Sequence, residues 1–141
     1  MNEHHVYFAV FGFDDEPGEV SRIAGRAPDD LWRKGESCSA LMPEARHREN
    51  RWLLTSGLDP QASHQAHFEG LVEKLEALGE ALPALRERYR CGIGVSQYFF
   101  MDDPTFYLPA ILLARYRALG LTLTFDQIGL DQAQARSARR G

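Results

Sequence analysis

Residues 59–78 read DPQASHQAHFEGLVEKLEAL, and most of the predicted architecture depends on this stretch. Its apolar residues recur at steps of three and four positions: Phe68, Leu71, Val72, Leu75 and Leu78. This spacing predicts one amphipathic helix, which Asp59 caps, Pro60 begins and Gly79 ends. Such a helix is not stable alone, so we expect its apolar face to lie flat against a β-sheet.

The flanking segments predict further strands and helices. Apolar or alternating runs favour strands over residues 6–13, 31–34, 51–56, 91–100 and 121–125. Shorter helices are expected to begin near Pro17, Pro83 and Asp102. The order matches a ferredoxin-like βαββαβ pattern with an added αβ unit. We therefore predict an α+β fold, with a mostly antiparallel sheet and helices packed on one face; a differently ordered α+β sheet is the alternative.

Length and composition are those of one soluble globular domain. The 141 residues suffice to bury a core, and 44% hydrophobic with 26% charged residues is ordinary for this class. We assign residues 1–130 to a single α+β domain and residues 131–141 to a flexible basic tail. The polar segment 36–50 is expected to be a long, mobile connection between two strands.

Charge and cysteine content exclude several classes of function. The net charge of -4 gives no general attraction for nucleic acids or anionic membranes, so neither is expected as a partner. Cys38 and Cys91 form no CxxC motif and predict neither a disulfide framework nor a zinc site, which favours a reducing cytoplasm. The apolar run 6–13 is too short to span a bilayer and follows no basic leader, so no signal peptide or membrane span is expected.

Several short motifs, spread over residues 7–128, are similar to those of one protein family. They are Phe11-Gly12, Glu19-Val20 with Ile23, Trp32-Arg33-Lys34-Gly35, Trp52 with Ser56, the leucine-rich central helix, Leu108-Pro109, Leu119-Gly120 and Phe125-Asp126. On these residues the chain resembles a bacterial family known only as domain of unknown function 4279. The resemblance implies a small bacterial α+β domain and assigns no catalytic residue.

One cluster of aromatic and cationic residues is the candidate binding site. If strands 31–34 and 51–56 pair as a hairpin, residues of both strands and of the 46–48 segment gather at one end of it. The predicted binding residues are Trp32, Arg33, Lys34, Arg51 and Trp52. Arginine offers a planar fork for carboxylate or phosphate, and tryptophan a face for stacking, so the cluster suits an acidic protein surface or an anionic small molecule. The alternative is that both tryptophans belong to the core, beneath the arginine stems.

Three other patterns have structural explanations. His64 and His67 can share a helix face, but no third ligand is near in sequence, so we expect solvated side chains and no metal. The acidic groups at 14–16 and 102–103 precede prolines and are interpreted as helix caps. Gly92 and Gly94 share one face of a strand, which predicts close packing of another helix, or alternatively of a ligand.

The sequence favours a binding protein over an enzyme. GxSxG, GxGxxG and GxxxxGKS/T are all missing, and neither cysteine lies in an activating sequence context. We predict a non-enzymatic bacterial cytoplasmic domain that binds another protein, for example an immunity-type protein that neutralises a toxin, with no cofactor. The alternative is a small anionic-ligand binder or enzyme that uses the Trp/Arg cluster. An exposed last strand could also pair with a second copy to form a homodimer.

Overall fold

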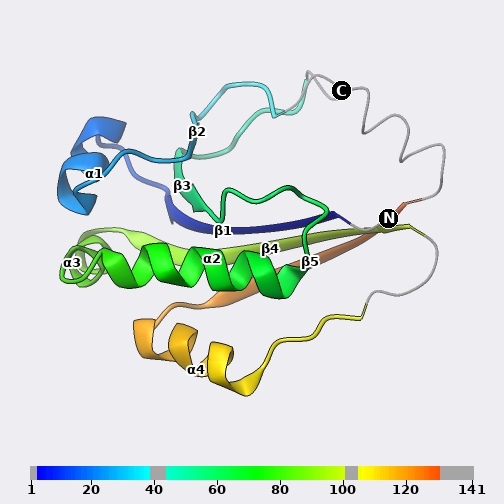
Figure 1. The fold of residues 1–141 in the computed structure, drawn as a ribbon. Helices are drawn as coiled ribbons and strands as arrows, with labels where there is room; N and C mark the ends of the chain where they lie inside the picture. The colour runs from blue at the N-terminus through cyan, green and yellow to red at the C-terminus, as the bar shows by residue number, and fades with distance from the viewer. Residues whose placement is uncertain (1–2, 39–43, 101–104, 131–141) are drawn as a thin grey trace.

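The computed structural model describes residues 3–38, 44–100 and 105–130, and these form one sheet with helices against it (Figure 1). In chain order the elements are β1 (Glu3–Phe11), α1 (Pro17–Ala24), β2 (Asp30–Trp32), β3 (Arg51–Thr55), α2 (His64–Ala77), α3 (Ala81–Arg88), β4 (Arg90–Phe100), α4 (Ala110–Leu119) and β5 (Leu123–Leu130). The predicted α+β class is confirmed. The predicted tail, 131–141, lies outside the described residues.

The sheet has the strand order β2-β3-β1-β4-β5. β1 lies at its centre and is antiparallel to both β3 and β4, β2 is antiparallel to β3, and β5 is parallel to β4. The sheet is therefore mixed, with three antiparallel pairs and one parallel pair. A ferredoxin-like relationship stays a prediction, because it requires more than the order and direction of the strands.

The core lies between the sheet and α2, as the apolar stripe predicted. Figure 1 shows α2 and α4 on the same side of the strands. From α2 the fully buried residues are Phe68, Leu71, Val72 and Leu75, and the sheet contributes Phe8, Val10, Trp52, Leu54, Ile93 and Val95. Alternation along β1 sends its even-numbered side chains into this core, so its odd-numbered side chains lie on the opposite face.

The start of α2 differs from the predicted one. The helix begins at His64, and Ser63 is its N-cap, with its side chain accepting a hydrogen bond from the backbone N–H of Ala66. Asp59 instead accepts a bond from the backbone N–H of Gln61 at 2.8 Å, so it closes a turn before the helix. The sequence holds two good capping residues, and the later one forms the cap.

The last helix and strand also begin later than predicted. α4 starts at Ala110 with Pro109 as its N-cap, while the predicted start at 102–104 lies outside the described residues. Tyr116 anchors α4, because its buried hydroxyl donates to the backbone carbonyl of Phe68 at 2.7 Å. β5 runs from Leu123 and forms one edge of the sheet. None of the helices in the described ranges combines the length and the apolarity of a membrane span.

Candidate functional site

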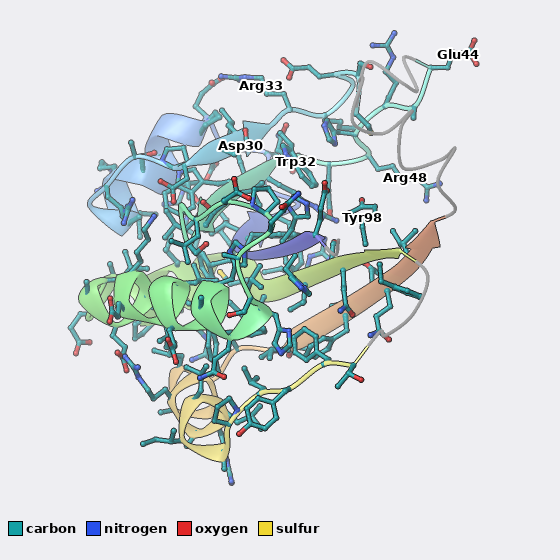
Figure 2. All side chains as sticks on the ribbon, turned by 45° about the vertical axis from the view of Figure 1, so that its right-hand side comes forward. Asp30, Trp32, Arg33, Glu44, Arg48 and Tyr98 are labelled. Carbon is teal, nitrogen blue, oxygen red and sulfur yellow. The ribbon has the colours of Figure 1, made fainter. Side chains whose placement is uncertain are left out.

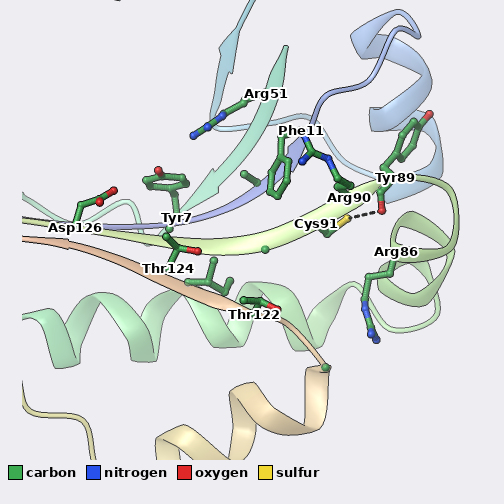
Figure 3. A pocket seen from close by; sticks show the side chains of 15 residues that line it. Tyr7, Phe11, Arg51, Arg86, Tyr89, Arg90, Cys91, Thr122, Thr124 and Asp126 are labelled. Atoms are coloured by element: carbon green, nitrogen blue, oxygen red, sulfur yellow. Dashed lines mark hydrogen bonds between the residues drawn. The ribbon is translucent and has the colours of Figure 1, made fainter. Parts of the chain in front are cut away.

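The sheet face opposite α2 carries aromatic and cationic side chains. Strand alternation sends Tyr7 and Phe11 of β1 to this face, and the pairing brings Arg51 of β3 and Arg90 of β4 beside Phe11. Figure 3 shows all four side chains on the side of the strands away from α2. We call this surface the open face.

Four residues form one cross-strand row on the open face. Trp32 pairs with Arg51, Arg51 with Phe11, and Phe11 with Arg90, so aromatic and cationic side chains alternate across β2, β3, β1 and β4. The guanidinium of Arg51 lies 5.2 Å from the Trp32 ring centre and 5.8 Å from that of Phe11. That of Arg90 lies 4.7 Å from the Phe11 ring centre. Each contact is within cation–π range, and we call this set the Trp–Arg row.

A single carboxylate occupies the cationic end of the Trp–Arg row. Glu49, just before β3, accepts hydrogen bonds from Arg90 at 2.8 Å through Oε2 and from Arg51 at 3.4 Å through Oε1. The Arg90 side chain is 68% exposed and the Arg51 side chain 33% exposed. Two guanidinium groups therefore share one carboxylate, which leaves a net positive charge and N–H donors that face solvent.

Tyr7 and Phe11 pack against the two glycines of β4 on the open face. Tyr7 pairs directly with Gly94, and a Cβ added at Gly94 would overlap with the Tyr7 ring. A Cβ at Gly92 would come within 3.7 Å of Phe11 and 3.3 Å of the carbonyl oxygen of Thr122. The predicted helix over these glycines is therefore wrong: aromatic side chains of the neighbouring strand pack there.

Tyr7 lies in the wall of two pockets. One, of about 530 Å³, extends along β4 and β5 and is lined by Phe11, Arg51, Arg90 and Thr124, among others. The other, of about 390 Å³, lies toward the start of β1 and has Trp32 in its wall. Both volumes fall within the usual range for small-molecule sites.

A comparison with known protein families identifies one family that matches this chain. The family described as domain of unknown function (DUF4279) matches residues 2–130. The chain belongs to this family. No curated protein and no solved structure matches it.

In this DUF4279 domain, the predicted binding residues separate into three locations. Trp32 and Arg51 lie together in the Trp–Arg row. Trp52 is fully buried on the opposite face, where its indole N–H donates to the Ser21 hydroxyl at 3.0 Å. Arg33 is exposed and Figure 2 shows it pointing away from the sheet.

Lys34, the remaining predicted residue of this DUF4279 domain, is also exposed, and its backbone N–H donates to the Asn50 side chain at 2.8 Å. Sequence reasoning missed Tyr7, Phe11 and Arg90 because their positions follow from the pairing of β1 with β3 and β4. The alternation of residues 6–13 was visible in the sequence, but its partner strands were not.

A buried polar cluster of the domain lies beneath the start of α2. His67 is buried, so the predicted solvated His64 and His67 pair is wrong for His67. The Ser56 hydroxyl lies 2.6 Å from its Nδ1, and its Nε2 has no partner among the described groups. His4 is buried nearby, and burial lowers the pKa of both His4 and His67. A lowered pKa favours the neutral form of both imidazoles, which burial requires. We therefore assign them a structural role at this end of the core.

In the described ranges of the domain, no group of three or more His, Cys, Asp or Glu side chains could hold a metal ion. Two titratable groups that line the open face have raised pKa values. Burial raises the pKa of Tyr89 to about 12 and that of the Cys91 thiol to about 12. Both shifts move these groups further from neutrality, whereas general acid–base catalysis needs a pKa near the working pH.

Proposed function

We propose that this protein is a non-enzymatic binding domain that holds an acidic segment of another protein against the Trp–Arg row. An immunity protein that neutralises a toxin by covering it would be one form of such a domain. The observation that supports the proposal is that the Glu49 carboxylate accepts hydrogen bonds from both Arg51 and Arg90, the two cations that lie over the Phe11 ring.

Glu49 marks where an acidic side chain of a partner would fit. Each guanidinium has five N–H donors, and Glu49 occupies a small part of them. Arginine already stacked on an aromatic ring loses less side-chain freedom when a second carboxylate binds, which lowers the entropic cost of association.

The remaining residues of the open face suit a protein partner. Tryptophan, tyrosine and arginine are the residue types that dominate the binding energy of protein interfaces. Tyr7 and Trp32 lie 6.1 Å apart by ring centres and extend the apolar surface beside the cations. A segment with acidic residues flanking an aromatic or aliphatic residue would match both features.

Selection of a random peptide library against the purified protein tests this proposal. We expect acidic peptides to be enriched, and Arg51→Glu to weaken their binding by about 2 kcal/mol, roughly thirty-fold in Kd. Arg117→Glu makes the same charge change on the exposed side of α4 and is expected to leave binding unchanged. Selected peptides that bind Arg51→Glu as tightly as the wild type would rule out the Trp–Arg row as the site.

A small anionic ligand is the second candidate, favoured by the pocket of about 530 Å³. Thr122 and Thr124 also line that pocket, and their hydroxyls can donate hydrogen bonds to such a ligand (Figure 3). Titration with phosphate and with phthalate, followed by NMR, separates the two candidates. A small ligand in this pocket would shift the Thr124 amide and lose affinity in Thr124→Val, whereas peptide binding should be insensitive to that substitution.

A further inference from the structure

The segment after β2 brings the exposed thiol of Cys38 beside an imidazole. The backbone N–H of Cys38 donates to the Ala45 carbonyl at 2.8 Å, and that of His47 donates to the Glu36 carbonyl at 2.9 Å. This antiparallel pairing makes Cys38 and His47 diagonal neighbours on one side of a short ribbon. Their side chains meet, with Sγ of Cys38 lying 3.6 Å from Nδ1 of His47.

Stacking on Trp32 fixes the orientation of the His47 imidazole. Its ring stacks on the Trp32 indole with 4.7 Å between ring centres and 18° between planes. The indole N–H of Trp32 donates to Asp30 at 3.3 Å, and the Arg51 guanidinium lies against the same indole. A base whose ring is fixed by a third group is the arrangement in which cysteine nucleophiles are activated.

The second cysteine has the opposite surroundings. Cys91 is partly buried, its Sγ lies 3.8 Å from the carbonyl oxygen of Tyr89, and burial raises the pKa of its thiol to about 12. Cys91 is therefore an inert thiol within the same chain.

We propose that Cys38 and His47 form a nucleophilic thiol–imidazole pair, and that Cys38 is the site at which this protein exchanges with small disulfides. Nδ1 of His47 takes the Cys38 proton, and the thiolate attacks one sulfur of the disulfide. A new S–S bond forms at Cys38 as the old one breaks, and its electron pair leaves on the second sulfur. That sulfur takes the proton from His47 and departs as a thiol. The adduct would lie beside Trp32, at the margin of the open face. This proposal does not depend on what the open face binds.

Reaction of the reduced, folded protein with dithiodipyridine at neutral pH tests the pair. We expect one fast phase that Cys38→Ser removes and a slow phase from Cys91. We expect His47→Gln to slow the fast phase by at least about threefold, because the thiol then has no neighbouring base to take its proton as it attacks. His64→Gln changes a histidine of α2, on the other side of the sheet and bonded to the Tyr107 backbone, and should leave the rate unchanged.

If His47→Gln folds poorly, a second measurement tests the pair in the wild-type chain. The wild-type chain unfolded in urea has the same two cysteines without the pair, so Cys38 should react more slowly there than in the folded protein. Equal Cys38 rates in the folded and unfolded chains, or a fast phase that survives His47→Gln in a folded variant, would overturn the proposal.

Discussion

The same substitution should lower stability by very different amounts at the two tryptophans. Trp52 is fully buried against the core, packs edge-on to Phe8 and donates a hydrogen bond to Ser21. Replacing it with alanine leaves a large cavity and an unpartnered hydroxyl, so we expect a loss of about 3–5 kcal/mol in the free energy of unfolding. Trp32 is partly exposed on the open face, so Trp32→Ala should cost under about 1 kcal/mol.

Urea unfolding followed by far-UV circular dichroism measures both variants. With a slope of about 2 kcal/mol per M, the Trp52→Ala midpoint should fall by roughly 2 M, while that of Trp32→Ala should move by less than about 0.5 M. Trp52→Phe is the matched control, since it keeps most of the apolar volume and should recover more than half of the loss. Equal costs for Trp32→Ala and Trp52→Ala would refute the assignment of the two side chains to opposite faces.

Three further substitutions or conditions test other parts of the structure. Tyr116→Phe removes the buried hydroxyl that ties α4 to α2, and calorimetry should show a loss of about 1–2 kcal/mol. Gly94→Ala should displace the Tyr7 ring and cost about 1–3 kcal/mol, measured by urea unfolding, with Tyr7→Ala expected to relieve most of this cost. Burial lowers the pKa of His4 and His67 below the ordinary 6.5, so the unfolded chain binds protons first as the pH falls. The free energy of unfolding should therefore be steady above pH 6.5 and decrease below it, and His67→Asn should reduce this slope.

The hydrophobic pattern predicted the core because burial depends mainly on local periodicity. The stripe on α2 repeats at helical spacing, and four of its five predicted residues are fully buried, while Leu78, just after the helix, is partly buried. The start of α2 was predicted less well, since Asp59 and Ser63 both have the chemistry of an N-cap. Which one caps the helix depends on the path of the chain from β3, and that path is set by tertiary contacts.

The glycines of β4 show a different limit of sequence reasoning. Their shared face correctly indicated that something packs close to the backbone. The identity of that group depended on register, because Tyr7 reaches Gly94 through direct pairing of β1 with β4. A shift of one residue would send Tyr7 to the core and Phe8 to the open face, so the burial of Phe8 fixes the register and with it the position of Tyr7.

Adjacent side chains of a strand point to opposite faces of the sheet, so Arg51 and Trp52 cannot belong to one binding surface. The side chain of Arg51 lies on the open face, and that of Trp52 lies on the face covered by α2. Trp32 joins Arg51 because it pairs with that residue across the hairpin. A ligand that contacts Trp32 and Arg51 therefore cannot touch Trp52. Any loss of binding in Trp52→Ala must follow its loss of stability, whereas Arg51→Glu should weaken binding about thirty-fold in a protein that remains folded.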